Sequence, residues 1–317
     1  MRRTSLVLLL LIGLVTVPWT ASAGAASQPT CFGEAATIVG SGVIVGTSGN
    51  DVIVGSAAND DIQGGDGDDR VCALQGSDVL GGGLGDDRVD GGPGDDRIVG
   101  EFAATQDNVT VDGGDDLLLG GPGDDRITGD FRNFAGAGEV SGAGGNDTIE
   151  GGRGRDSLIG DSGAIIISGN GGNDTLDSGP DDDFAIGGDS NAQDLASGDG
   201  GDDTMTGGPG NDGFLIGDNG VFTCEGVITG DGGNDVISGG AGNDAPIVGD
   251  ADPVCGVPTG TAGDDSLFGD DGDDQLHGDN FTDTGNPVFD SGTGNDTCDG
   301  GAGTDTAVNC ERLAGIP

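Results

Sequence analysis

Two adjacent stretches of nine residues decide the fold: residues 82–90 read GGLGDDRVD, and residues 91–99 read GGPGDDRIV. Both follow the pattern Gly-Gly-x-Gly-(Asn/Asp)-Asp-x-aliphatic-x. About twenty copies of it recur in register along most of the chain. A period this short leaves no room for an ordinary globular core. It predicts a solenoid in which each repeat supplies one turn and one short strand.

The residue types in the repeat indicate what each position does. The first six residues predict a turn, because glycine allows positive φ and close approach between neighbouring coils. The last three or four residues predict a short strand whose eighth residue points inward. The inward column is expected to contain Val71, Leu80, Val89, Ile98, Ile127, Ile149, Leu158, Leu176, Ile237, Leu267 and Leu276.

The sixth residue is nearly always Asp, and it places a carboxylate at the turn among backbone carbonyl groups. Parallel strands pair at a spacing of about 4.8 Å, so successive turns are expected to stack directly on one another. Stacked turns of this composition form cages of oxygen atoms. Calcium takes six to eight oxygen ligands at about 2.3–2.6 Å, and such cages suit it.

These repeats resemble those of the RTX, or haemolysin-type, calcium-binding family, and the resemblance covers nearly all of the chain after residue 40. It implies an all-β fold, a parallel β-roll or β-solenoid, in which the sixth-position Asp and the turn carbonyls bind Ca²⁺ jointly with the neighbouring coil. Two positions depart from the pattern, because Ala58 and Asp181 replace the glycine that precedes Asp60 and Asp183. The metal ligands that the resemblance implies are Asp51, Asp60, Asp69, Asp78, Asp87, Asp96, Asp116, Asp125, Asp147, Asp156, Asp174, Asp183, Asp203, Asp212, Asp235, Asp244, Asp265, Asp274, Asp296 and Asp305.

The charge of the chain explains why metal would be needed for folding. There are 57 acidic and 10 basic residues, a formal net charge of −47, and every basic residue is arginine. About twenty calcium ions, one per repeat as the family implies, would cancel most of this repulsion. We therefore expect a largely disordered chain without calcium that folds when calcium binds. The sign of the charge disfavours nucleic-acid binding.

The amino terminus predicts export. Arg2 and Arg3 precede an apolar run from Leu6 to Val17, and residues 21–23 read ASA, which is typical of a signal-peptidase site. Cleavage there would start the mature chain at Gly24. The run is too short to span a bilayer, so a retained anchor is the weaker alternative, and no later segment predicts a membrane span.

The sequence divides into five segments. They are a signal peptide (1–23), an amino-terminal cap (24–45), simple nonapeptides (46–99), compound repeats of about 30 residues with long side turns (100–290), and the last repeats with a carboxy-terminal cap (291–317). The opening residues 37–40, with Cys31 and Cys72 around them, also resemble secreted actinobacterial members of the family.

Each long turn tends to open with a Gly-Asp or similar pair, and most close with a short β-like stretch such as residues 165–167 or 227–229. Because the insertions recur once per repeat, they are expected to line up on one side of the solenoid. The pairs are Gly129-Asp130, Gly160-Asp161, Gly217-Asp218, Gly249-Asp250 and Gly278-Asp279.

Six cysteines in an exported chain predict disulfides. Cys224 and Cys255 occupy equivalent long turns, one compound repeat apart. They are stacked neighbours if one compound repeat is one full coil of three strands, and lie on opposite faces if it is one and a half coils; we favour the bond. Cys298 with Cys310 would then staple the carboxy-terminal cap, and Cys31 would pair with Cys72. Zinc is the weaker alternative, because no close Cys pairs or His partners exist.

Three classes of function fit to different degrees. A secreted calcium-loaded rod with a structural, matrix or adhesion role fits best, with extracellular matrix, polysaccharide or a cell surface as possible partners. An accessory or catalytic module of a polysaccharide-active enzyme is the alternative, but the chain has no space for a separate catalytic domain, and its one histidine, His277, lies within a repeat strand. An ice-binding adhesin fits least, because the third repeat position lacks a regular row of Thr. The sequence therefore predicts a protein that is not an enzyme.

Overall fold

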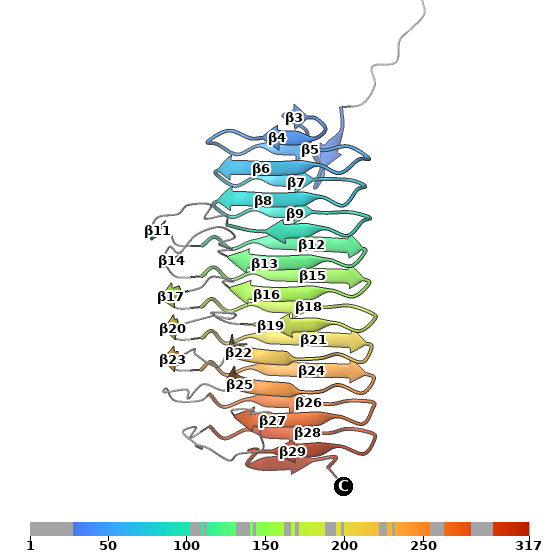
Figure 1. Cartoon of the computed structure of the whole chain (residues 1–317), viewed down its shortest axis with the longest axis vertical. Helices are drawn as coiled ribbons and strands as arrows, with labels where there is room; N and C mark the ends of the chain where they lie inside the picture. Colours follow the sequence, from blue (N-terminus) through green and yellow to red (C-terminus); the bar gives the residue numbers. More distant parts are fainter. Residues whose placement is uncertain are drawn as a thin grey trace, which may run out of the picture.

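The computed structural model describes residues 28–101, 109–110, 113–130, 140–141, 144–161, 166–168, 171–187, 195–197, 200–221, 227–229, 232–253, 263–279 and 294–316. These residues build an elongated stack of coils, in which the chain advances by one layer per coil (Figure 1). The predicted signal peptide and the Cys224–Cys255 pair lie outside the described residues.

Two long parallel sheets face each other across the solenoid. The first sheet is made of β3 (Ile38–Val39), β5 (Val52–Val54), β7 (Arg70–Cys72), β9 (Arg88–Asp90), β12 (Leu117–Pro122), β15 (Thr148–Arg153), β18 (Thr175–Asp177), β21 (Thr204–Pro209), β24 (Val236–Ala241), β26 (Ser266–Phe268), β28 (Thr297–Asp299) and β30 (Arg312–Ala314). The second sheet is made of β4 (Val43–Val45), β6 (Asp61–Asp66), β8 (Val79–Leu84), β10 (Arg97–Val99), β13 (Arg126–Asp130), β16 (Ser157–Asp161), β19 (Phe184–Ile186), β22 (Leu215–Val221), β25 (Ile247–Pro253), β27 (Gln275–Asp279) and β29 (Thr306–Val308).

A third parallel sheet runs beside them along the middle of the molecule (Figure 1). It is made of β11 (Val109–Thr110), β14 (Val140–Ser141), β17 (Ile166–Ser168), β20 (Leu195–Ser197) and β23 (Val227–Thr229). Its strands come from the long turns, so these insertions do line up on one side, as expected. A short antiparallel pair, β1 (Thr30–Cys31) and β2 (Glu34–Ala35), covers the amino-terminal end.

The length of one coil changes along the chain. Hydrogen bonds between equivalent turns join residues 18 apart in the first coils, such as Asp51 and Asp69. In the later coils the separation is between 27 and 32 residues, as for Asp147 with Asp174 and Asp203 with Asp235. One compound repeat is therefore one full coil with three strands, whereas a simple coil has two.

The strands are longer than predicted where the turns stack well. In β12 and β15 pairing continues into the first three turn positions, with Gly121 opposite Gly152 and Pro122 opposite Arg153. From the sequence, all six of these positions were predicted to belong to the turn. The ladder extends because Gly121 adopts a φ of +108° and still pairs with its counterpart in the next coil.

The core is the single inward column that the repeat predicts. Its side chains interlock between the first two sheets, and each has at most 1% of its surface exposed among the eleven predicted members. The same column also takes in residues that were not predicted: Ile44, Ile53, Ile62, Leu118, Ala185, Met205, Leu215, Ile247 and Cys298.

A second buried row lies on the outer face of the second sheet. Val99, Thr128, Ile159, Ile216 and Val248 occupy one register position, which Ile186 shares, and are all buried. The equivalent Val45 and Val308 in the end coils are 65% and 48% exposed. This position is therefore buried in the middle coils and exposed at the two ends.

Disulfides hold both ends of the solenoid. Cys31 in β1 is bonded to Cys72 in β7, with a Cα–Cα distance of 5.6 Å, and Cys298 is bonded to Cys310 with a Cα–Cα distance of 6.0 Å. Both pairings were predicted. Each closes an end coil that has a neighbour on one side only, which is where a solenoid needs support.

Candidate metal centres

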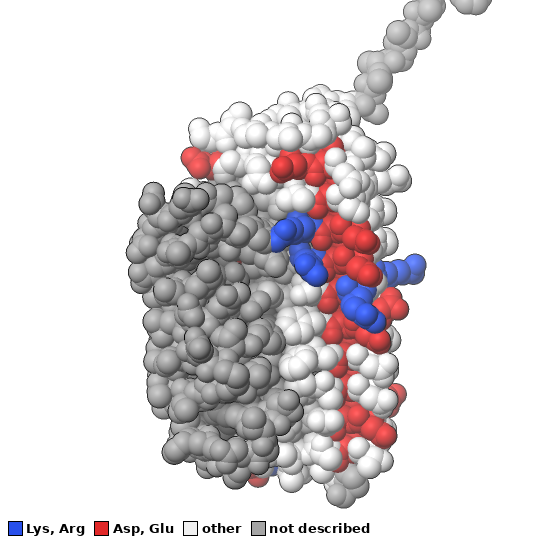
Figure 2. Space-filling view, in the orientation of Figure 1, with Lys and Arg blue, Asp and Glu red and all other residues white. Residues whose placement is uncertain are grey.

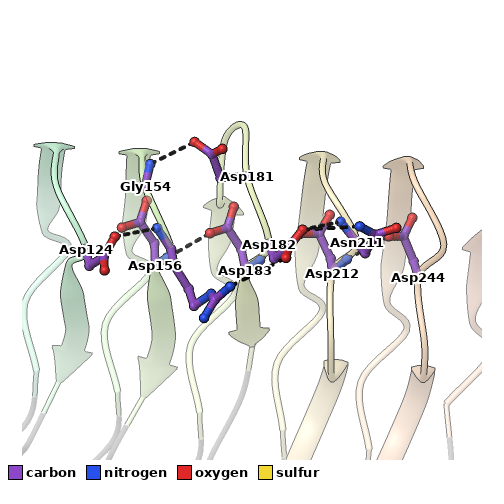
Figure 3. Close-up of polar contacts among 10 residues, drawn as sticks. Asp124, Gly154, Asp156, Asp181, Asp182, Asp183, Asn211, Asp212 and Asp244 are labelled. Atoms are coloured by element: carbon purple, nitrogen blue, oxygen red, sulfur yellow. Dashed lines mark hydrogen bonds and ion pairs between the residues drawn. The ribbon is translucent and has the colours of Figure 1, made fainter.

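The sixth-position aspartates form two unbroken ladders, one along each edge of the solenoid. Each Asp lies at the end of its turn, directly before a strand, and is at most 7% exposed. The backbone amide of one Asp donates to Oδ1 of the equivalent Asp in the next coil, as from Asp156 to Asp183 at 2.7 Å (Figure 3). The first ladder contains Asp51, Asp69, Asp87, Asp116, Asp147, Asp174, Asp203, Asp235, Asp265 and Asp296. The second ladder contains Asp60, Asp78, Asp96, Asp125, Asp156, Asp183, Asp212, Asp244, Asp274 and Asp305.

The other carboxylate oxygen points into the turn. This Oδ2 atom is buried and accepts no hydrogen bond in Asp69, Asp78, Asp87, Asp96, Asp116, Asp125, Asp147, Asp156, Asp174, Asp183, Asp212, Asp235, Asp244, Asp274, Asp296 and Asp305. A buried acceptor without a donor is costly, and a column of them is a strong sign of a positively charged ligand.

The glycine that opens each turn leaves room beside this oxygen. A Cβ built on Gly120 would lie 2.5 Å from Asp125 Oδ2 and 2.6 Å from the carbonyl oxygen of Gly151, one coil on. An equivalent pair of oxygens lies beside Gly207, where a Cβ would be 2.5 Å from Asp212 Oδ2 and 2.6 Å from the Gly239 carbonyl oxygen. Carboxylate and carbonyl oxygens converging from two coils are the ligands that calcium prefers, so the residues fit the ion.

The two edges differ in their electrostatics. Burial raises the pKa of Asp125 to about 7 and that of Asp156 to about 6, with the neighbouring carboxylates adding to the effect. On the other edge burial raises the pKa of Asp116 to about 10, and the carboxylate of Asp147 adds to it. At Asp116 the first ladder is therefore more strongly desolvated and more crowded with negative charge than the second, whereas at Asp69 and Asp87 the pKa is raised only to about 6 and about 7.

A third set of acids explains this difference. Glu101, Asp130, Asp161, Asp218 and Asp250 directly follow the first glycine of five long-turn coils, and all are buried. They occupy the second position of the turn, where most turns of the second ladder have glycine. Three groups of carboxylates on this edge have ligand atoms within 4.8 Å of one another. The groups are Glu101 with Asp116 and Asp130, Asp130 with Asp147 and Asp161, and Asp218 with Asp235 and Asp250.

From the sequence, these Gly-Asp pairs were predicted to open the long turns, but their acids were not predicted to be metal ligands. The signal was the return of an acid at one fixed step after the strand in coil after coil. These acids lie beside the first ladder because the chain returns to the same turn after the long insertion. The position at which it returns could not be predicted from the sequence.

The amino-terminal members of the ladders differ from the rest. Asp51 Oδ2 accepts from the Thr47 amide at 2.7 Å and from the Thr47 hydroxyl at 2.8 Å. Asp60 Oδ2 accepts from the Ser56 amide at 2.7 Å. Thr47 and Ser56 take the place of the second glycine, and these two aspartates are hydrogen-bonded by the protein itself.

The carboxy-terminal end of the first ladder is closed by a different acid. The amide of Asp296 has no further Asp above it, and it donates instead to Oε2 of Glu311 at 2.9 Å. Glu311 thus occupies the place of the next coil's carboxylate.

The fifth-position residues form an outer, exposed ladder. The backbone amide of Asn211 donates to Asp182 Oδ1 at 3.0 Å (Figure 3). The backbone amide of Arg155 donates to Asp124 Oδ1 at 3.0 Å. Acidic side chains form a stripe along one side of the surface, with arginines gathered beside its middle part (Figure 2). The ion pair of Arg155 with Asp182 at 3.5 Å belongs to this outer layer.

All twenty predicted metal-ligating positions lie in these two ladders, in stacked turns and with their carboxylates buried. The structure is thus a parallel β-solenoid whose edges are lined with cation-binding oxygens. The family model of the RTX calcium-binding nonapeptide repeat matches residues 45–80, 73–102, 104–131, 134–164, 166–193, 190–214, 227–245, 259–285 and 283–307. The chain belongs to this family, and its cofactor is Ca²⁺ bound at multiple sites.

No curated protein matches the chain. Within the residues that the structure describes, no helix is long and apolar enough to cross a membrane.

Proposed function

We propose that this protein is a secreted rod that folds when it binds calcium and serves a structural, matrix or adhesion role outside the cell, without catalysis. The observation that carries the proposal is the pair of buried aspartate ladders along the solenoid. Each ladder brings acidic side chains into a dry environment at every coil, and nothing in the sequence balances a net charge of −47.

The ladders make calcium part of the fold. Without cations, the buried carboxylates repel one another, and glycine-rich turns lose much backbone entropy on ordering. The ligands come from two successive coils, so a preformed site does not exist in the unfolded chain. Calcium binding and folding are then one process.

Two features support a place outside the cell. The end coils are closed by disulfides, which persist in oxidising compartments. The residues before Gly24 also have the organisation of a signal peptide. Free calcium is plentiful there, and weak extracellular sites of about 10⁻⁴–10⁻³ M would be filled.

Small-angle X-ray scattering of the mature chain tests the rod. In millimolar calcium we expect the profile of a stiff rod, and after calcium removal that of an expanded chain. Identical rod-like profiles under both conditions would contradict the proposal.

Export is tested separately by expressing the full chain and sequencing the amino terminus of the protein in the medium. We expect it to begin at Gly24. Full-length chain that stays with the cells would show that the amino-terminal segment anchors or retains the protein.

A further inference from the structure

The second-position acids have no role in the repeat pattern, yet they are among the most deeply buried groups in the molecule. Asp130 and Asp218 have no exposed surface, and Asp161 is 1% exposed. They recur only in the coils that carry a long turn. Five carboxylates kept in this environment need a ligand or a proton to balance each of them.

One oxygen of each acid is fixed by the protein. Asp130 Oδ2 accepts from the Gly145 amide at 2.5 Å, and Asp161 Oδ2 accepts from the Gly172 amide at 2.6 Å. These glycines lie beyond the long turn, at the start of the next coil. The bond therefore holds the acid at a fixed place at the base of the turn. Equivalent bonds join Glu101 with Gly114, Asp218 with Gly233, and Asp250 with Gly263.

The second oxygen of each acid is left without a hydrogen bond. Asp130 Oδ1, Asp161 Oδ1 and Asp218 Oδ1 are buried and accept from no donor. The neighbouring Asp147 Oδ2 and Asp235 Oδ2 are likewise buried and accept from no donor. Within each group the ligand atoms lie within 4.8 Å of one another, close enough to share one ion.

The backbone adds oxygen and space at the same place. A Cβ on Gly129 would collide with Asp147 Oδ2 and with the carbonyl oxygen of Gly160. A Cβ on Gly217 would collide with the equivalent pair, Asp235 Oδ2 and the Gly249 carbonyl oxygen. The same arrangement of glycine, carboxylate oxygen and carbonyl oxygen thus occurs beside two of the three carboxylate groups, at Gly129 and at Gly217.

We propose that Glu101, Asp130, Asp161, Asp218 and Asp250 complete a second class of calcium site, made of three carboxylates and specific to the edge that carries the long turns. Each site joins the second-position acids of two successive coils to the sixth-position Asp between them. This inference rests on the proposed calcium role of the first ladder.

Charge balance supports a divalent ion. Each coil that begins with Glu101, Asp130, Asp161, Asp218 or Asp250 adds two buried carboxylates to this edge, one from the second position and one from the sixth, and one Ca²⁺ neutralises them. The second ladder adds only one buried carboxylate per coil. Sites with more charged ligands bind calcium more tightly, so this edge is expected to fill first.

The site also has a mechanical consequence. Asp130 lies before a long turn and Asp147 lies after it, so an ion held by both closes the base of that turn. Calcium on this edge would then hold the third sheet against the solenoid and complete the burial of the outer row that includes Ile159 and Ile216.

Isothermal titration of the calcium-free mature chain with calcium chloride tests the proposal. The variant is Asp130→Asn with Asp161→Asn, which preserves size and the anchoring acceptor. The matched control is Asp86→Asn with Asp115→Asn, which removes the same charge from exposed fifth positions on the same edge. We expect a tighter and a weaker class of sites in the wild type and in the control. In the variant, the two tight sites that contain Asp130 or Asp161 should weaken by about tenfold or more.

The outcomes separate the two proposals. An isotherm of the variant equal to that of the control would overturn the three-carboxylate site and would mean that neighbouring acids share protons instead. A wild type that takes up no calcium would overturn the proposed function itself. Circular dichroism in saturating calcium checks that the variant folds; if it does not, the single change Glu101→Gln at the end of the row replaces it in the same titration.

Discussion

Asp116 and Asp125 hold the same position in two turns of one coil, yet burial raises the pKa of Asp116 to about 10 and that of Asp125 only to about 7. The difference arises because Asp116 is more deeply buried and the carboxylates of Asp147 and Asp130 add to the effect, whereas glycine occupies the second position of the turn that contains Asp125. Two edges built from one repeat are therefore chemically distinct.

These shifts predict how pH affects the calcium-free chain. The folded carboxyls have a pKa above their ordinary value of 3.8, so the folded state binds more protons than the unfolded state. The stability they contribute is complete below pH 3.8 and is lost as the pH rises through about 7 and onward to about 10. We expect calcium-free protein, dialysed to remove chelator, to show more β-structure by circular dichroism at pH 4 than at pH 8. Equal spectra at the two values would show that protons cannot replace calcium in the turns.

Asp156→Asn tests the second ladder in the middle of the rod. The amide keeps an oxygen for the bond from the Asp125 amide, which is 2.8 Å long in the wild type, but loses the charge that attracts calcium. We expect one or two sites to weaken by about tenfold in calcium titrations. Asp124→Asn, an exposed neighbour in the preceding coil, is the control and should leave the isotherm unchanged.

Gly120→Ala tests the space beside the ligand oxygens. The added methyl group would lie 2.5 Å from Asp125 Oδ2, so it would displace the oxygen or the ion. We expect a loss of about 1–3 kcal/mol in the free energy of unfolding in calcium, together with weaker calcium binding. Gly213→Ala is the control, because its nearest neighbour would be the Ala245 carbonyl oxygen at 4.0 Å. If both variants melt at the wild-type temperature, the cradle is not a binding site.

Leu158→Ala tests the inward column. Leu158 has no exposed surface, and its removal leaves a cavity that the neighbouring coils cannot close. We expect a loss of about 2–5 kcal/mol in calcium. Val236→Ala, at a residue that is 43% exposed, should change stability by no more than about 0.5 kcal/mol. Thermal melts of the two variants in saturating calcium make the comparison.

Much of this structure follows from the period of the sequence. Residues such as Val89 and Ile98 recur every nine positions, so strand, turn and inward column were all predictable. The disulfides of Cys72 with Cys31 and Cys298 with Cys310 followed from the need to close the two ends. The coil length of the later repeats remained open, because a spacing of about 30 residues fits more than one way of winding.

The residues that the sequence did not explain depend on register across the insertions. Ile216 resembles an exposed strand residue in the sequence but is buried, and Asp130 resembles an ordinary turn residue until the next coil brings Asp147 and Asp161 to it. Likewise, Asp51 fits the ligand pattern, but Thr47 in place of glycine adds a hydroxyl that donates to its carboxylate.

Far-UV circular dichroism of the mature chain during a calcium titration tests the central claim most directly. The chain has no Tyr, and its one Trp, Trp19, lies in the predicted signal peptide, so a backbone signal is the right probe. We predict a cooperative change from coil to β-structure with calcium at pH 7.5, and no such change with magnesium at the same concentration. A chain that is already rich in β-structure without calcium, and whose spectrum calcium does not alter, would contradict the account.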